Sequence, residues 1–559
     1  MEIEERKGVF IAKILITAAL PYANGPLHLG HIRSTYLPAD IYARYNRLLG
    51  NETYYVCATD EHGTPILASA EKAGKTPAEF TEYYHKKDEE EVRRLGFSFD
   101  IFHRTSSVDN KKMTQYFYTN LRKNGYIYDK EVEQAYCEKC SRFLPDRFVI
   151  GTCPHCNAEG QYSDYCDACG KALGAGEIRN PKCLVCGAKP TTRKSMHCFL
   201  ALGKFSEKLK SWLSSNPELQ KEILNYVNNW IENGLADWDI TRDMNWGVPV
   251  PDRPGTVFYV WFDAPIGYAS STAALLPQRW EEFWKEGKEK TRLVHFIGKD
   301  IIYHHFLFWP AMLMGVGDGL RLPDAIPTRG HLNLEGRKFS KSKNWFVSLE
   351  DYLKEFDADY LRYYTTMVTP HSVGDADFVW KDFQQKINNE LVACIGNYAH
   401  RTLVLLKKLA NSEVPKAEKL EEDDERVLAS MEAARKSIGE KIEKFLLKEG
   451  LEEICAFTAT LNKYLSDREP WKEKDEGRRA NCLYVSTRGL TALAILLEPY
   501  LPFTSRKMFA MLGISEKELK WSNVEKELLK AGAKIGEVKP LFEKVSDEKI
   551  EEQEKKLAK

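Results

Sequence analysis

A chain of 559 residues, with 43% hydrophobic and 29% charged residues, has the composition of a globular protein of roughly three to four domains. The 80 basic and 81 acidic residues nearly cancel, so the overall charge gives no evidence for a nucleic-acid partner, which would need local basic patches. The absence of a long apolar run and the polar, acidic N-terminus argue against a membrane span and a signal peptide, and we expect a cytoplasmic protein.

The first predicted unit is a strand, a turn and a helix. Lys13–Thr17 has the pattern of a short buried strand. A turn rich in Pro, Asn and Gly follows, and the helix is expected to begin near Pro26, which suits a first helical turn. Such a unit opens nucleotide-binding α/β folds, where phosphate lies at the helix N-terminus. Pro38 falls inside the predicted helix and should kink or split it.

Two histidines stand at the start of this helix. His28 and His31 are three residues apart and therefore share one helix face, and Gly30 between them lets a ligand approach the backbone. The plain alternative is a pair of polar histidines on a helix surface. The strand and turn before them favour the functional interpretation.

Polar residues follow three further predicted strands, which cover Glu52–Ala58, Val257–Trp261 and Arg292–Ile297. Asp60 comes after the first strand, Asp263 after the second, and Lys299 with Asp300 after the third. Any one of these could be an ordinary cap or turn residue. Their recurrence after strand ends favours a ligand site at the edge of a parallel sheet.

Four CxxC pairs lie between the two halves of the predicted sheet: Cys137 and Cys140, Cys153 and Cys156, Cys166 and Cys169, Cys183 and Cys186. Four thiolates bind zinc tetrahedrally, so eight predict two closed structural sites without catalysis. Chance cysteines or redox pairs are the alternative, which the regular spacing disfavours. The spacing allows three ways of joining the pairs. His155 and His197 could replace a cysteine, but four complete pairs make them unnecessary.

The second half of the chain begins with a basic loop and continues with helices. Lysine-rich loops such as Gly336–Asn344 are usually solvated, but the histidine motif upstream favours a mobile phosphate clamp. An antiparallel helix bundle is predicted from the apolar periodicity of Ile387–Leu409, Val427–Leu447, Leu451–Leu465 and Cys482–Leu501. The charged tail, Lys544–Lys559, predicts a solvated helix or a disordered segment.

Three bundle residues are candidates for contact with RNA. Asn397 and Arg401 share a helix face, and Trp471 follows a proline at a helix end, where an indole can stack on a base. On their own, these would be a capping Asn, a surface Arg and a half-buried Trp.

Two motifs carry a resemblance to a known family. Pro21–His31 and Lys338–Ser342 closely resemble the HIGH and KMSKS motifs of class I aminoacyl-tRNA synthetases. Ala19–Gly25, Phe258–Tyr268 and His295–Ile301 are similar to segments of the methionyl-tRNA synthetase family, and the resemblance runs over nearly the whole chain. The motifs depart from the family pattern at Leu29 and Phe339, where no charged or small residue that the chemistry needs is lost.

The resemblance implies an activity and its site. Methionine would be activated by Mg²⁺–ATP and transferred to tRNA(Met) for translation initiation and elongation. His28, His31, Lys338 and Lys341 would stabilise charge on the phosphates. The resemblance implies ATP contacts from Gly30, Lys299, Asp300, Ser340 and Ser342. It implies methionine contacts from Ala19, Leu20, Tyr22, Asp60, Arg242, Trp261, Ala264, Pro265, Tyr268, Ile301 and His305, with Asp60 on the ammonium and Arg242 near the carboxylate.

The same resemblance extends to the metal sites, the tRNA and the partners. Asn397, Arg401 and Trp471 would read the anticodon. Nested pairing is implied for two Zn²⁺ ions: Cys153, Cys156, Cys166 and Cys169 on one, Cys137, Cys140, Cys183 and Cys186 on the other. The sequence ends without the additional C-terminal tRNA-binding domain of some family members, which a separate subunit could supply.

The expected fold is an α/β Rossmann-type parallel-sheet catalytic domain, split by a zinc-knuckle insertion and followed by an α-helical bundle. We expect the catalytic halves at 1–120 and 246–327, the insertion at 121–245, the KMSKS-loop domain at 328–388, the anticodon-binding bundle at 389–540 and the tail at 541–559. One rival is a class I synthetase for leucine, isoleucine, valine or cysteine, although no long editing insertion fits the chain. The other is a non-catalytic zinc-knuckle RNA-binding module, which would not need both the histidine and the lysine motif.

Overall fold

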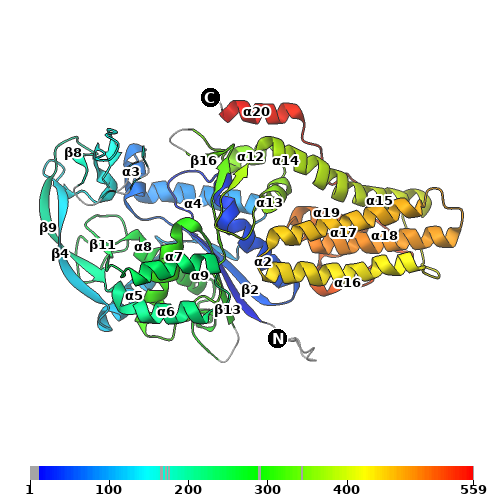
Figure 1. The fold of residues 1–559 in the computed structure, drawn as a ribbon, viewed down its shortest axis with the longest axis horizontal. Helices are drawn as coiled ribbons and strands as arrows, with labels where there is room; N and C mark the ends of the chain where they lie inside the picture. The colour runs from blue at the N-terminus through cyan, green and yellow to red at the C-terminus, as the bar shows by residue number, and fades with distance from the viewer. Residues whose placement is uncertain are drawn as a thin grey trace.

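The computed structural model describes residues 12–163, 166, 168–169, 171, 173, 177–287, 291–340 and 344–557. The molecule is elongated, with an α/β part in its centre, a β-rich insertion at one end and a helix bundle at the other (Figure 1).

A five-stranded sheet lies at the centre of the α/β part, in the order β14-β13-β1-β2-β3. Its strands are β1 (Lys13–Ala18), β2 (Glu52–Thr59), β3 (Ile101–Arg104), β13 (Thr291–Gly298) and β14 (Thr328–Arg329). Every neighbouring pair is parallel. Because β1 pairs with β2 on one side and with the much later β13 on the other, the chain changes direction across the sheet at β1. Open α/β sheets bind ligands at such a switch point, beyond the carboxyl ends of the strands.

Both faces of this sheet are buried, as its strand sequences predict. Ile14 and Ile16 of β1 pack into one hydrophobic core with α2 (Leu37–Leu48), whereas Leu15 packs into a second core with α9 (Ile266–Leu275). The alternation follows from successive side chains of a strand pointing to opposite faces. The first core continues into the helix bundle, so the sheet and the bundle share buried side chains.

The strand prediction for Val257–Trp261 is wrong beyond Phe258. β12 covers only Val257–Phe258 and pairs antiparallel with β11 (Thr241–Arg242), outside the parallel sheet. Helix α8 (Val260–Asp263) follows at once, so Asp263 ends a helix. Short apolar runs that are buried on all sides do not distinguish a strand from a helix, which is the reason for the error.

The insertion is built on a long antiparallel strand pair, β4 (Ile127–Cys137) and β9 (Thr191–Leu200). Together with β5 (Arg142–Phe143) and β10 (Trp238–Asp239) they form a sheet in the order β10-β9-β4-β5. The cysteine pairs lie beyond its outer end, around the small sheet of β6 (Val149–Thr152), β7 (Gln161–Tyr162) and β8 (Arg179–Cys183). Helices α6 (Ser206–Ser215) and α7 (Lys221–Glu232) follow.

A small sheet and two helices connect the catalytic part to the bundle. The sheet contains β16 (Arg337–Lys338), β15 (Leu332–Leu334) and β17 (Ala376–Phe378), and the helices are α12 (Leu349–Glu355) and α13 (Ala358–Met367). The helix bundle predicted from the sequence is confirmed. It contains α14 (Trp380–Lys386), the π-helical segment Ile387–Gly396, α15 (Asn397–Leu409), α16 (Glu422–Glu443), α17 (Leu447–Arg468), α18 (Glu476–Leu497) and α19 (Pro502–Leu512) (Figure 1).

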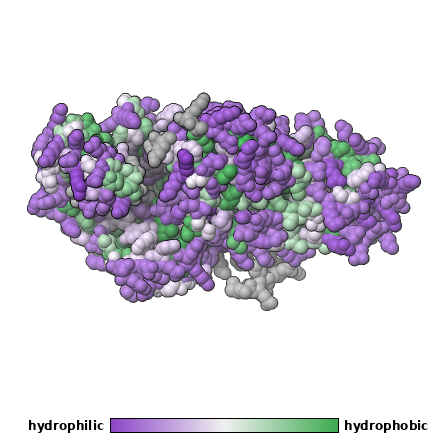
Figure 2. Space-filling model, turned by 45° about the horizontal axis from the view of Figure 1, so that its top comes forward, coloured by the Kyte–Doolittle hydropathy of each residue, from purple (hydrophilic) through white to green (hydrophobic). Residues whose placement is uncertain are grey.

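Helix α18 is the one helix of the described residues that has the length and apolar composition of a membrane span, but 83% of its apolar window is buried inside the molecule. It is therefore the core helix of the bundle. The face in Figure 2 is mainly hydrophilic, with hydrophobic side chains in scattered patches.

The C-terminal tail returns to the connecting helices. Its described part forms α20 (Asp547–Leu557), so the helix alternative holds and the disordered one is wrong here. Most side chains of this helix are exposed to solvent, and Ile550, Gln553 and Leu557 are buried. Gln384 of α14 donates a hydrogen bond to the Val545 carbonyl at 3.2 Å, which fixes the approach to the helix.

A buried ionic joint holds the bundle against the catalytic part. Asp40 of α2 accepts hydrogen bonds from Arg44 (2.8 Å) and from Arg362 of α13 (2.7 Å), and Arg44 also binds Glu498 (2.7 Å) at the end of α18. Burial alone would raise the pKa of Asp40, but the two arginines and Ser98 lower it to about 2. The carboxylate is therefore ionised and fully partnered, as a buried charge must be to avoid a large desolvation penalty.

Candidate active site

A cavity of about 740 Å³ opens beyond the carboxyl ends of β1, β2 and β13. Its wall contains most of the predicted site residues: Ala19, Leu20, Tyr22, His28, Gly30, His31, Asp60, Arg242, Trp261, Ala264, Pro265, Tyr268, Asp300, Ile301, His305 and Lys338. They come from both halves of the sheet, from the insertion and from the small connecting sheet. The switch point at β1 brings these distant segments to one place.

His28 and His31 cap the start of the first helix with reciprocal hydrogen bonds. The Nδ1 of His28 accepts from the Gly30 N–H at 3.1 Å, and the Nδ1 of His31 accepts from the His28 N–H at 3.0 Å. The helix therefore begins at Leu29, and the prediction of a start near Pro26 is wrong because the His28 side chain, not the proline, caps it. A π-helical turn at Ile32–Tyr36 precedes α2, and Pro38 lies in the first turn of α2. The backbone is helical through both junctions, so the prediction of a split at Pro38 is wrong: the helix changes type just before the proline without a break.

The lysine loop approaches the histidines through Phe339. The Phe339 ring lies against the cavity beside His28, and the exposed Lys338 side chain lines the same wall. Ser340 pairs through its backbone with Trp345 at 2.9 Å. Lys341 and Ser342 lie outside the described residues. Lys299 does not line the cavity, since its ammonium forms an ion pair with Asp375 at 2.7 Å.

Asp60 is a buried carboxyl in the cavity wall. Burial, followed by the charge of the nearby Asp263, raises the pKa of Asp60 well above the usual carboxyl range. Its Oδ1 is buried and has no hydrogen-bond partner among the described residues. Asp263 is itself paired with the His62 ring at 2.7 Å. An unpaired buried carboxyl oxygen is costly, and a cationic group placed in the cavity would satisfy it.

Aromatic side chains form the apolar end of the cavity. The Trp261 ring stacks on His304, with ring centroids 3.7 Å apart. The Tyr268 hydroxyl lies 2.9 Å from Nε2 of His305, and Nδ1 of His305 lies 3.1 Å from the Ile301 carbonyl. Because a carbonyl can only accept, Nδ1 carries the proton and Nε2 accepts from Tyr268. Burial lowers the pKa of His305 to about 4, so this ring is neutral at neutral pH.

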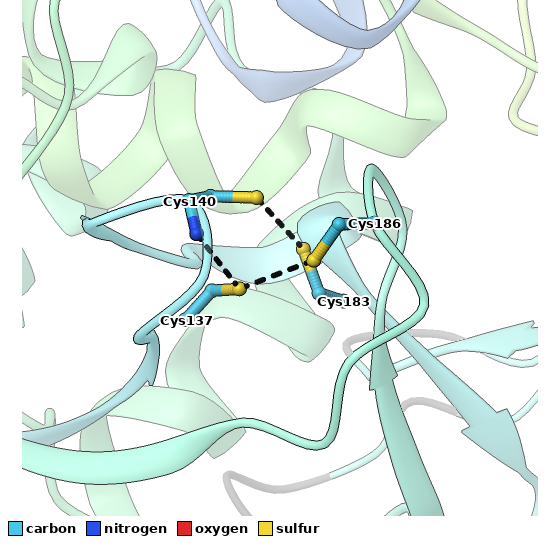
Figure 3. Close-up of side chains that lie close together, drawn as sticks. All are labelled: Cys137, Cys140, Cys183 and Cys186. Atoms are coloured by element: carbon cyan, nitrogen blue, oxygen red, sulfur yellow. Dashed lines mark hydrogen bonds between the residues drawn. The ribbon is translucent and has the colours of Figure 1, made fainter.

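The eight cysteines of the insertion gather in two sets of four, in the nested arrangement. Cys137, Cys140, Cys183 and Cys186 form one set (Figure 3), and Cys153, Cys156, Cys166 and Cys169 form the other; within each set all sulfur atoms lie within 4.8 Å of one another. The Sγ atoms of Cys137 and Cys186 are 3.4 Å apart, and those of Cys156 and Cys166 are 3.6 Å apart. Four thiolates around one zinc would be separated by about 3.8 Å, whereas a disulfide needs about 2.0 Å. Both sets can therefore hold a metal ion.

Comparison with known proteins identifies the family. Residues 14–403 match the model of class I tRNA synthetases (M), and residues 414–559 match the model of the anticodon binding domain of methionyl tRNA ligase. The methionine–tRNA ligase of Methanosphaera stadtmanae is 42% identical over 98% of this chain and 82% of its own length. That of Methanopyrus kandleri is 44% identical over 97% of this chain and 81% of its own length.

The chain belongs to the methionyl-tRNA synthetase family.

Solved structures of this family share the fold. Mycobacterium tuberculosis methionyl-tRNA synthetase bound by methionyl-adenylate matches with a TM-score of 0.79 at 24% identity, covering 95% of this chain and 100% of that chain. The free form of the same enzyme matches with a TM-score of 0.72 at 23% identity, covering 97% and 99%. The Rossmann-type sheet with its insertion and helical C-terminal part is thus the architecture of the methionyl-tRNA synthetases.

The three bundle residues predicted to contact the anticodon lie together in this methionyl-tRNA synthetase fold. Asn397 and Arg401 lie on α15, and Trp471 follows the end of α17 with 43% of its surface exposed. The Arg401 guanidinium lies 5.5 Å from the centre of the Trp471 ring. The result is an exposed aromatic face next to a cation, which suits stacking on a base.

Several cavity residues of this synthetase were not predicted from the sequence. Phe339, which departs from the KMSKS pattern, stacks on His28. His304 stacks on Trp261, and Arg147 brings a guanidinium from the insertion to the cavity. His331 contacts Asp300 at 3.2 Å. A local signal existed only for His304, whose neighbours Ile301 and His305 were predicted.

Proposed function

We propose that this chain is a methionine–tRNA ligase that makes methionyl-adenylate from methionine and Mg²⁺–ATP and then transfers the methionyl group to the terminal adenosine of tRNA(Met). The carrying observation is a single cavity that joins an aromatic, apolar end and the buried Asp60 carboxyl to the paired histidines His28 and His31. The reaction would serve translation initiation and elongation in the cytoplasm.

The apolar end of the cavity would bind the methionine side chain. Leu20, Trp261, Ala264 and Tyr268 offer apolar and aromatic surface, and a thioether sulfur makes favourable contacts with aromatic rings. Ala19, Tyr22, Pro265, Ile301 and His305 complete this wall. Asp60 would bind the ammonium and Arg242 the carboxylate. This assignment accounts for the buried Oδ1 of Asp60, because the bound ammonium supplies its missing partner.

ATP would lie between the two motifs. Gly30 leaves room beside the His28 ring, and His28, His31 and Lys338 would bind the phosphates together with Lys341, Ser340 and Ser342 of the loop. Asp300 at the end of β13 would hold the ribose, with Lys299 beside it. In the first step the methionine carboxylate attacks the α-phosphorus, the bond to the β-phosphate oxygen breaks, and pyrophosphate leaves. In the second step a ribose hydroxyl of the tRNA attacks the methionyl carbonyl and AMP leaves. The protein contributes positioning and charge stabilisation.

The remaining parts would serve structure and tRNA recognition. Each cysteine set would hold one structural Zn²⁺, and the domains would follow the boundaries expected above. Asn397, Arg401 and Trp471 would read the anticodon. A separate tRNA-binding subunit would add to the affinity for tRNA.

The proposed function is tested by ATP–pyrophosphate exchange without tRNA, with methionine, leucine, isoleucine, valine and cysteine as substrates. We expect exchange with methionine and much weaker exchange with the others. Exchange that prefers another amino acid would keep the class I reaction and reject the methionine assignment. No exchange with any of them, by folded protein that binds tRNA, would favour an RNA-binding module.

A further inference from the structure

His197 is a fully buried histidine on β9 and is not among the residues that line the cavity. Its Nδ1 lies 2.6 Å from Oδ2 of Asp239, and its Nε2 lies 3.0 Å from Oδ2 of Asp243. Ionised carboxylates only accept hydrogen bonds, so a ring that binds one on each side carries a proton on both nitrogens. The ring is therefore an imidazolium between two anions, and neither cysteine set uses it.

The side chain of Gln134, on the neighbouring strand β4, supports this protonation state. Its amide nitrogen lies 2.5 Å from Nε2 of His197, which would be a contact between two donors, while its Oε1 is buried without a partner among the described residues. Turning the amide by half a rotation exchanges the two atoms, which have nearly the same shape. The carbonyl oxygen of Gln134 then accepts from the ring, and the contact between two donors is removed.

The two aspartates flank a residue of the cavity wall. Asp239 and Asp243 stand at the two ends of the segment that carries Arg242, a residue of the cavity wall. The Arg242 guanidinium lies over the Tyr259 ring at 4.0 Å and donates to the Thr241 carbonyl at 2.7 Å. It also lies 3.5 Å from Oδ2 of Asp239. Asp239 is thus shared between two cations, and the closer one is His197.

We infer that the His197 imidazolium is a positioning residue: by binding Asp239 and Asp243 it fixes the Arg242 segment and, as the closer cation, weakens the ion pair between Asp239 and Arg242, the cavity residue that would bind a substrate carboxylate. The inference rests on the proposed function, in which Arg242 binds the carboxylate of methionine. His197 itself does not line the cavity and touches no reacting atom.

The surroundings of His197 give the expected direction of its pH dependence. Asp239 and Asp243 face it from the Arg242 segment and Gln134 from β4, while Lys130, opposite it in register, extends over the Phe199 ring at 5.0 Å. Burial lowers the pKa of His197, but the two carboxylates more than offset this, and the pKa is raised above its usual value. The imidazolium therefore keeps its proton to higher pH than an ordinary histidine and loses it as the pH rises through the raised pKa.

The test compares methionine with methioninol, which keeps the ammonium and the thioether but lacks the carboxylate. His197→Gln removes the charge while keeping a polar side chain. We expect the KM for methionine in ATP–pyrophosphate exchange to rise about tenfold, the effect of one lost charge-assisted contact, with little change in kcat. The inhibition constant of methioninol should stay within about twofold. In the parent enzyme the ratio of the KM for methionine to the inhibition constant of methioninol should rise as the pH passes through the raised pKa of His197. In His197→Gln this ratio should not change with pH.

Two further variants provide a second test and a control. Asp243→Asn leaves the ring in place and should give a smaller rise in the same ratio, which covers the case that His197→Gln fails to fold. His103→Gln, which removes a histidine 3.8 Å from Asp109 outside the cavity wall, should leave the ratio unchanged. Equal loss of methionine and methioninol binding, or a pH profile shared by parent and variant, would overturn the positioning role. A parent enzyme that exchanges without methionine specificity would instead reject the proposed function.

Discussion

The His28 ring lies parallel to the Phe339 ring, with the centroids 4.7 Å apart and an angle of 4° between the planes. This stack joins the two motifs of the candidate active site directly. Gly30 makes it possible, because a Cβ at this position would lie 3.0 Å from the His28 ring and 3.1 Å from the Phe339 ring. This aromatic contact therefore positions the start of the lysine loop against the histidine motif.

Removing the stack should slow amino-acid activation. Phe339→Ala loses a ring contact of about 0.5–1.5 kcal/mol, so we expect ATP–pyrophosphate exchange to fall roughly three- to tenfold. Phe339→Tyr keeps the ring and should retain most of the rate. If Phe339→Ala exchanges at the parent rate, the stack does not position the loop.

Asp60→Asn should raise the stability of the fold at neutral pH and weaken methionine binding. A carboxyl whose pKa is higher in the folded chain stabilises the fold only at acid pH, and this contribution is lost as the pH rises through the raised pKa. Asp60→Asn should therefore raise the Tm at neutral pH and lose this gain in acid. The KM for methionine should rise roughly tenfold or more, as one charge-assisted hydrogen bond is lost.

Thermal unfolding at several pH values and exchange kinetics measure both effects of Asp60→Asn. Asp109→Asn, at a site outside the cavity wall, is the control and should change neither quantity much. A lower Tm for Asp60→Asn at neutral pH would contradict the assigned cost of the buried carboxyl.

Each cysteine set should lose its metal independently. Cys137→Ala and Cys166→Ala should each reduce bound zinc from two ions per chain to one, because the sets share no ligand. Ligation provides apparent folding energy of about 10–16 kcal/mol in zinc-finger peptides, so proteolysis should cut the insertion selectively. Metal analysis measures the stoichiometry, with Cys394→Ala outside both sets as the control. Loss of both ions from one variant would argue for a shared site.

The surface formed by Asn397, Arg401 and Trp471 should affect the charging of tRNA and leave amino-acid activation unchanged. Trp471→Ala removes an exposed ring whose stacking on a base is worth about 1–3 kcal/mol, so kcat/KM for tRNA charging should fall roughly 5- to 150-fold. Exchange without tRNA should be unchanged. Tyr83→Ala is a matched control, since Tyr83 is 52% exposed and has Lys75 5.1 Å from its ring centre. Equal damage to charging and exchange would reject the anticodon role.

The buried joint between the bundle and the catalytic part should be sensitive to a single charge. Asp40→Asn leaves Arg362 and Arg44 without their shared anion, which should cost about 3–5 kcal/mol of unfolding free energy. Because the pKa of Asp40 is lowered to about 2, its contribution is complete above the usual carboxyl range and is lost as the pH falls towards 2. Denaturant unfolding at neutral pH measures the loss. Asp423→Asn, at an exposed ion pair with Arg426, should change stability little.

The parts of the site that the sequence predicted have local signals. The histidine motif follows a strand and a turn, and each CxxC pair is a short turn that supplies two thiolates. Contacts between distant segments have no such signal. Nothing near Phe339 indicates that its ring meets His28, and nothing near Arg147 indicates that it reaches the cavity. The strand predicted at Val257–Trp261 failed for a related reason, since packing from several sides decides between β12 and α8.

The position of β1 between β2 and β13 also governs how the protein is made. Its first partner strand is complete at Thr59, but its second begins only at Thr291. At about 5–20 residues per second, a ribosome needs roughly 12 to 46 s to synthesise the residues between them. During that interval one edge of a buried strand stays without a partner, and the cavity has no second wall. The cysteine-rich insertion emerges within this interval, and its long strand pair, β4 and β9, is complete before β13 is made. The insertion can therefore pair its own strands before the later half of the sheet is made.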